Sequence, residues 1–215
     1  MTARAAAGEA GRPGTGEEGV AQVITVQGLT IAFLVAPEGN EQGELAGAWQ
    51  AVLEAGGMPR LLSTRPGWVQ AYRQLDQADT FRVDGVVEES DLADCAALVL
   101  PGGVVGVDRL RSVPAAVAFV RACCEAGKPV AAIGHAPWLL IEAGMVRGRT
   151  LTSWSTLRTD LENAGAAWVD EQVRTCPAGP GPLITSRKTA DLPLFTDALV
   201  SECARLRGGL GPWSR

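Results

Sequence analysis

A buried strand, an amphipathic helix and a second strand follow one another between residues 29 and 63, and this unit constrains the fold more than any other feature. Residues 29–35 form a nearly continuous apolar run, typical of a strand that is buried on both faces. Residues 44–55 repeat apolar side chains at helical spacing and end at a pair of glycines. A short strand over 59–63 completes the unit, which predicts parallel strands joined by a right-handed crossover.

The alternation of strands and helices continues along the chain and predicts a three-layer α/β/α sandwich with a mostly parallel central sheet. We expect a turn at 37–43 and, within a more polar excursion at 64–89, a small hairpin around 81–87. Further strands are predicted over 95–100, 129–133, 150–153, 167–169, 172–175 and 183–186, and further helices over 114–126, directly after 134–135, over 157–164 and over 192–206. This organisation predicts a disordered leader at 1–26, a single domain at 27–206 and a frayed tail at 207–215.

Composition excludes several classes of partner. The net charge is −5 and no basic run is present, so we expect no nucleic-acid partner. No apolar run approaches the roughly 18 residues that span a bilayer, and residues 1–28 lack the layout of a signal peptide, so we expect a cytoplasmic protein with no membrane partner. The five cysteines form no CxxC pair or Cys/His cluster, which favours reduced thiols and predicts no metal site.

The apolar run at 130–133 stops abruptly at Gly134 and His135, and an apolar helix is predicted to start at once. A strand that turns sharply into a helix places the turn residue at the carboxyl edge of the sheet, where several α/β enzyme families carry their nucleophile. Glycine offers no side chain that could react. His135 is the only histidine in the chain.

Several segments together resemble the DJ-1/PfpI superfamily, within the class I glutamine-amidotransferase-like fold, and its PfpI-like branch in particular. The resemblance covers roughly residues 29–206. The segments that carry it are LVLPGG at 98–103, GKPVAAI at 127–133, AGMVRGRTLTS at 143–153, NAGAAWVDE at 163–171, and TSRK at 185–188 with DLP at 191–193.

The resemblance implies a flavodoxin-like fold, a homodimer or larger homo-oligomer, and no cofactor. It also implies an active site at the elbow, which is the sharp turn between strand and helix at Gly134 and His135. Carried over by position, the family's elbow cysteine falls on Gly134 and its following histidine on His135. The family's acidic residue falls on Glu44, and the oxyanion turn on Gly103. The departure from the family pattern is therefore at the nucleophile itself.

Without a thiol at position 134, activity as a cysteine protease, deglycase or glyoxalase is disfavoured. The backbone of Gly103, Gly134 and His135 should still form an oxyanion site, with the N–H groups of Gly103 and His135 facing the pocket. The His135 side chain is either a general acid or base or a vestigial histidine, and Glu44 is either functional or an ordinary first-turn acid. The side chains expected to line the pocket are Trp138, Trp154 and Ser153, with core packing as the alternative for the first of these.

Two functions remain open. The first is an enzyme that uses Glu44 and His135 for general acid/base catalysis, with oxyanion stabilisation, on a small carbonyl-containing metabolite. Hydration, dehydration, isomerisation, cyclisation or C–C cleavage would suit such a site, and specialised metabolism would be a natural setting. The alternative is a catalytically inactive pseudoenzyme that serves as a ligand-binding or assembly protein.

Overall fold

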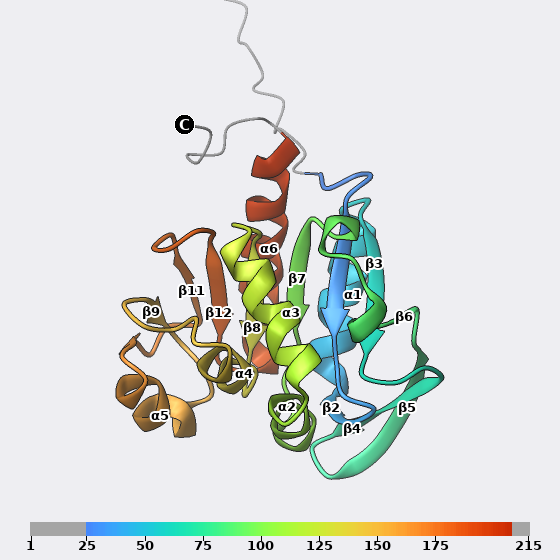
Figure 1. Ribbon diagram of the computed structural model, residues 1–215, viewed down its shortest axis with the longest axis horizontal. Coiled ribbons are helices and arrows are strands. Elements are labelled where there is room, and N and C mark those ends of the chain that lie inside the picture. Colours follow the sequence, from blue (N-terminus) through green and yellow to red (C-terminus); the bar gives the residue numbers. More distant parts are fainter. Residues whose placement is uncertain (1–24, 208–215) are drawn as a thin grey trace, which may run out of the picture.

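A seven-stranded sheet forms the centre of the protein (Figure 1), which is described by a computed structural model over residues 25–207, apart from the side chain of the last residue. The predicted leader at 1–26 and tail at 207–215 lie almost entirely outside the described residues. The strand order in the central sheet is β11-β12-β8-β7-β1-β3-β6, and every neighbouring pair is parallel except β11 with β12. The predicted mostly parallel α/β sheet is confirmed.

The central strands are short, and β7, β8 and β12 are buried along their whole length. Their bounds are Thr30–Leu34 (β1), Met58–Ser63 (β3), Gly85–Val86 (β6), Ala97–Leu100 (β7), Val130–Ile133 (β8), Val173–Cys176 (β11) and Leu183–Ser186 (β12). Two small sheets accompany them, one made of Glu38–Glu41 (β2), Trp68–Arg73 (β4) and Asp76–Arg82 (β5), the other of Thr150–Leu151 (β9) and Ala167–Trp168 (β10).

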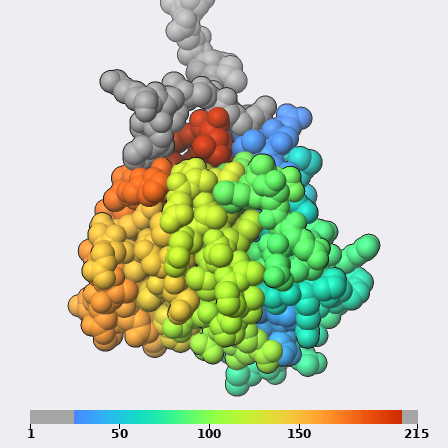
Figure 2. All heavy atoms as spheres, in the orientation of Figure 1, coloured from blue at the N-terminus to red at the C-terminus, as the bar shows by residue number. Residues whose placement is uncertain are grey.

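Helices cover both faces of the central sheet. Their bounds are Gln42–Glu54 (α1), Val104–Arg111 (α2), Pro114–Glu125 (α3), Pro137–Glu142 (α4), Arg158–Asn163 (α5) and Leu192–Arg207 (α6). Helix α3 fills the middle of the face seen in Figure 2, while α1 and α6 pack together behind the sheet.

The side chains of β1 alternate between the two faces and show why three layers form. Ile31 and Phe33 are fully buried in one apolar cluster with residues of α1 and α6. Ala32 and Leu34 are fully buried in the other cluster, with residues of α2, α3 and α4. Because successive side chains of a strand point to opposite faces, a continuous apolar run supplies both cores at once.

The structure corrects two local predictions and adds one helix. Residues 38–41, predicted as a turn, are strand β2. The hairpin lies at 68–82, earlier than the predicted 81–87, and projects from one end of the molecule (Figure 1). Helix α2 was not predicted: it begins after Gly103 without a side-chain cap, so the usual start signal is missing from the sequence. Within the described residues, no helix has the length and apolar character needed to cross a membrane.

Candidate functional site at the carboxyl edge of the sheet

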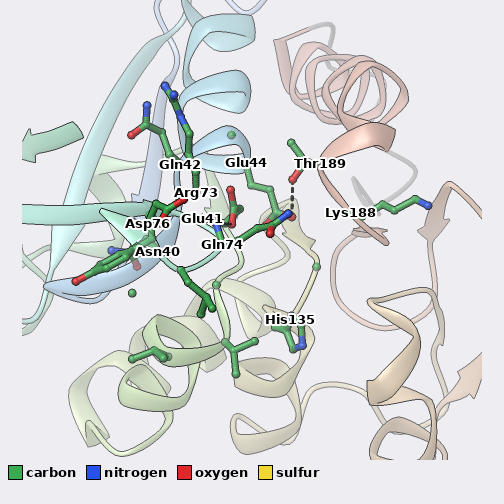
Figure 3. A pocket seen from close by; sticks show the side chains of 18 of the residues that line it. Asn40, Glu41, Gln42, Glu44, Arg73, Gln74, Asp76, His135, Lys188 and Thr189 are labelled. Atoms are coloured by element: carbon green, nitrogen blue, oxygen red, sulfur yellow. Dashed lines mark hydrogen bonds between the residues drawn. The ribbon is translucent and has the colours of Figure 1, made fainter. Parts of the chain in front are cut away.

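A cavity of about 1190 Å³ lies at the carboxyl edge of the central strands, beside the elbow that follows β8 (Figure 3). Because β1, β7 and β8 are parallel, the segments that follow them meet at this edge. The elbow, the start of α1 and the start of α2 form one wall. The tip of the β4–β5 hairpin, residues 72–76, forms another.

Glu44 is a buried acid in the first turn of α1, with 5% of its surface exposed. Its Oε2 accepts a hydrogen bond from the backbone N–H of Gly102 at 2.8 Å, and the Thr189 hydroxyl donates to Oε1 at 3.3 Å. Burial, with a smaller contribution from the charge of Glu41, raises the pKa of Glu44 to about 7 against the opposing effect of these hydrogen bonds. Near neutral pH the carboxyl is therefore poised to give or take a proton.

Gly134 forms the elbow between β8 and α4 and has a φ of +64°, a conformation that favours glycine. Its N–H donates to the Ser186 carbonyl at 3.0 Å, and its own carbonyl accepts from the Trp154 N–H at 2.9 Å, so the turn is held on both sides. A Cβ atom added here would lie 3.0 and 3.1 Å from the carboxyl oxygens of Glu44. The acid and the elbow therefore face each other across the space that a side chain would occupy.

At this edge, neither the Gly103 N–H nor the His135 N–H has an acceptor among the described residues. Gly103 has a φ of +111° and follows the glycine whose N–H is already bonded to Glu44. A Cβ on Gly102 would lie 3.3 Å from the His135 nitrogen, so the two turns are in close contact. Gly103 and His135 both line the cavity. Unpaired N–H groups beside a cavity can receive an oxyanion or a carbonyl oxygen.

The His135 side chain lies between two indole rings. Its ring centroid is 5.8 Å from that of Trp154, nearly stacked at 26°, and 5.4 Å from that of Trp138, tilted at 58°. Burial lowers the pKa of His135, and no carboxylate among the described residues is within ion-pair distance of it. The imidazole is therefore mainly neutral at pH 7, the form that accepts a proton.

The structure separates the three side chains that were predicted to line the pocket. Trp154 lines it. Trp138 does not: its Nε1 donates to Asp160 at 2.7 Å, and it borders a separate, smaller groove with Arg111. Ser153 does not either, because it is fully buried and bonded to its neighbours. The alternation of side chains along the segment after β9 turns Trp154 towards the cavity and Ser153 away from it.

Sequence reasoning missed the residues that reach the site from a distance. Thr189, which bonds Glu44, is 145 positions further along the chain, in the segment after β12. The hairpin tip is held beside α1 by a hydrogen bond from the Gln74 N–H to Glu41 at 3.1 Å. The only available signal for Thr189 was its place just after a strand, since all such segments of a parallel sheet meet at one edge.

The described residues offer neither a thiol nor a metal cluster at this cavity. All five cysteines are buried and free, and none of them lines the cavity. Within residues 25–207, the His, Cys, Asp and Glu side chains form no group of three that could hold a metal ion. At the end of the cavity beside the elbow, the groups that can do chemistry are thus the Glu44 carboxyl, the His135 imidazole and backbone N–H groups.

Comparison with known proteins gives a consistent family assignment. The DJ-1/PfpI family matches residues 29–202. A protein named a deglycase, from Pyrococcus horikoshii, is 34% identical over 164 residues, which is 76% of this chain and 93% of that protein. General stress protein 18 of Bacillus subtilis is 41% identical over 113 residues, 53% of this chain and 63% of that protein.

Solved structures give the same result. A two-domain protein from Anabaena variabilis, with DJ-1/ThiJ/PfpI-like and ferritin-like domains, superposes with a TM-score of 0.73 at 31% identity. The match covers 86% of this chain and 49% of that one. Drosophila melanogaster DJ-1beta gives a TM-score of 0.72 at 25% identity, covering 82% and 90% of the two chains. The chain thus spans about half of the Anabaena protein and under two thirds of the Bacillus one.

Proposed function

The chain belongs to the DJ-1/PfpI family, and we propose that it is a member in which Gly134 takes the place of the elbow cysteine and acid/base catalysis replaces covalent catalysis. Relatives in this family carry names such as deglycase and putative cysteine protease. A thiol mechanism needs sulfur at the elbow, and the five thiols of this chain all lie away from the cavity. The substrate in this proposal is a small carbonyl-containing molecule.

One observation carries the proposal: Glu44, a carboxyl whose pKa is raised to about 7, faces the glycine elbow beside two unpaired N–H groups. A carbonyl oxygen placed over the N–H groups of Gly103 and His135 would be polarised by them. Protonated Glu44 would donate its proton to that oxygen while neutral His135 accepts a proton from the adjacent carbon. The product is an enol, with no covalent bond to the protein.

Enol formation is a step that isomerisation, dehydration, cyclisation and retro-aldol C–C cleavage can share, so these reaction classes are the ones we propose. Addition of water to a carbonyl would use the same donors, with water in the space beside Gly134. None of these reactions needs a nucleophilic side chain.

Deuterium exchange tests proton transfer without knowledge of the natural substrate. Simple ketones (cyclohexanone, 1-tetralone and 1-decalone) are incubated with the protein in D₂O, and loss of the α-proton signal is followed by NMR. We expect exchange above the buffer rate in the wild type and a loss of about 10²-fold or more in Glu44→Gln and His135→Ala. Glu54→Gln, on the exposed side of the same helix, is the matched control and should exchange like the wild type.

Two results would refute this function. Equal exchange by the wild type and both site variants would show that Glu44 and His135 do not move the protons. Turnover of methylglyoxal by the wild type would show that this chain performs the chemistry that Gly134 is proposed to have removed. Absence of exchange on every ketone, with binding retained, would instead favour a ligand-binding protein.

A further inference from the structure

We propose that the cavity takes an uncharged ligand with a flat aromatic ring fused or joined to its carbonyl group. This inference rests on the proposed function, because the carbonyl is assigned to the N–H groups of Gly103 and His135. The ring, the size and the lack of charge rest on the other walls of the cavity.

The cavity is large for a two- or three-carbon substrate. Its volume of about 1190 Å³ exceeds the range of roughly 300–1,000 Å³ that is usual for pockets holding drug-sized ligands. The groups proposed to act on the carbonyl occupy only the end beside the elbow, at positions 44, 103, 134 and 135. The rest of the cavity extends along Trp154, the start of α2 and the hairpin tip, so a ligand that fills it carries a sizeable group beyond its carbonyl.

An aromatic wall flanks the carbonyl end. Trp154 and His135 both line the cavity and are nearly stacked on each other, and 40% of the Trp154 surface is exposed. Behind them Trp138 contacts the imidazole and is itself held by its hydrogen bond to Asp160. A wall fixed in this way offers a flat ring a surface of matching shape, and such stacking favours an aromatic group over a puckered one.

Apolar side chains line other parts of the cavity. Val104 and Val105, in the first turn of α2, are about half exposed, at 49% and 54%. Leu75, at the hairpin tip, is 94% exposed. All three line the cavity. Exposed apolar side chains gathered around one opening indicate a ligand with an apolar body, because covering them with such a body removes apolar surface from water.

The charges that line the cavity cancel. Apart from Glu44, the acidic side chains are Glu38, Glu41 and Asp76, and the basic ones are Arg73, Arg109 and Lys188. Glu38 and Arg109 are paired with each other at 2.7 Å. With Glu44 protonated, the described lining has no excess of either sign, so a charged ligand would lose hydration without gaining a surplus of opposite charge. The lining therefore favours a neutral ligand.

Three probes with one bicyclic skeleton separate these features. 1-Tetralone is a neutral ketone on an aromatic ring, 1-decalone is its saturated counterpart, and 1-tetralone-6-carboxylate adds a negative charge. Dissociation constants are measured by isothermal titration calorimetry at pH 6, below the raised pKa of Glu44, so that its carboxyl is protonated. We expect 1-tetralone to bind about three- to tenfold more tightly than 1-decalone, the range that aromatic stacking provides. The carboxylate should bind more weakly than 1-tetralone by about tenfold or more.

Trp154 is tested with two substitutions and a matched control. Trp154→Leu should abolish the preference for 1-tetralone over 1-decalone, while Trp154→Phe, which keeps a flat ring, should retain most of it. Trp68→Leu removes a tryptophan that is 62% exposed and does not line the cavity, so it should leave every dissociation constant unchanged. Circular dichroism of each variant confirms that it is folded.

The proposal is wrong if 1-decalone or the carboxylate binds as tightly as 1-tetralone, if none of the three binds, or if the preference survives in Trp154→Leu. Failure of the proposed function gives a different result. In that case 1-tetralone is still preferred in the binding experiment, but the protein does not exchange its α-protons.

Discussion

The cavity has two walls that are built in opposite ways. The sheet-edge wall, made by residues 44, 103, 134 and 135, is held by close backbone contacts, and its acid is 5% exposed. The hairpin wall, residues 72–76, stands in solvent, and its Leu75 is 94% exposed. The proposed chemical groups all belong to the first wall. The proposed chemical groups are therefore positioned by backbone packing, whereas the hairpin can change its side chains at little cost in stability.

Two glycines with positive φ test this contrast most strongly. Gly103→Ala places a Cβ against the Gly39 carbonyl and 2.8 Å from the Glu41 nitrogen, both backbone atoms that cannot easily move. We expect a loss of about 3–5 kcal/mol in the free energy of unfolding, from backbone strain plus overlap. Gly67→Ala, just before the hairpin, has a φ of +106° but nothing within 4 Å, and should lose only about 1–2 kcal/mol.

Urea denaturation measures both variants. Equal losses in the free energy of unfolding would show that the sheet-edge wall accommodates a new side chain as easily as the hairpin does. That result would contradict the proposed difference between the two walls.

Glu44→Gln should change how stability depends on pH. The folded-state pKa of Glu44 is raised from an ordinary value of 4.5 to about 7, so the folded protein keeps a proton that the unfolded chain loses. This effect is absent below pH 4.5, lowers stability as the pH rises towards 7, and is complete above 7. Relative to the wild type, the glutamine variant should gain about 3 kcal/mol between pH 4.5 and pH 8.

Thermal and urea unfolding of both proteins across this pH range would reveal the gain. Glu54→Gln, exposed on the same helix, serves as the control. A difference between Glu44→Gln and the wild type that does not vary with pH would contradict the raised pKa.

Gly134→Cys should introduce a reactive thiol with a smaller loss in the free energy of unfolding than Gly103→Ala. The φ of +64° costs a non-glycine residue about 1–2 kcal/mol, and the new Cβ meets only the flexible end of Glu44, at 3.0 Å. Iodoacetamide should label the folded variant once, as measured by mass spectrometry, while the five buried cysteines of the wild type stay unmodified.

Gly144→Cys has a similar φ of +74° and open space around it, and it isolates the backbone strain from the contact with Glu44. If the thiol at 134 resists labelling while that at 144 reacts, then the elbow is not open to the cavity.

Leu75→Ser should have the smallest effect on stability. At 94% exposure the side chain buries almost nothing, so the free energy of unfolding should change by less than about 0.5 kcal/mol. Urea denaturation measures this, with Leu45→Ala, a fully buried position of α1, as a contrast expected to lose about 2–5 kcal/mol. A large loss at Leu75 would mean that the hairpin tip packs against something in solution.

The elements that carry the elbow could be predicted because their signals are local. The apolar run at 130–133 is buried throughout, and it stops where Gly134 must turn. Strand β2 could not be predicted, because its residues Glu38–Glu41 are polar and it forms by pairing with β4, some 30 positions away. Strands of this kind are created by tertiary pairing, not by their own sequence pattern.

The candidate site shows the same division. The resemblance identifies Glu44 and His135. The hydrogen bond between Glu44 and Gly102, however, joins residues 58 positions apart, and no local sequence pattern predicts it. Trp138 and Ser153 were assigned to the cavity from proximity in sequence to the elbow and the next strand. Their orientation depends instead on hydrogen bonds with Asp160 of α5 and Trp168 of β10, which form only once these elements have packed.

Strand β2 passes directly into α1, since Glu41 is both its last residue and the residue that precedes the helix. The same Glu41 accepts the hydrogen bond from the hairpin tip, and its charge helps to raise the pKa of Glu44. A ligand that displaces the hairpin would therefore alter the surroundings of the Glu41 charge, and with them the proton affinity of Glu44. By reciprocity, protonating Glu44 would alter the affinity for such a ligand. For such a ligand, occupancy of the cavity and proton uptake would form one coupled equilibrium.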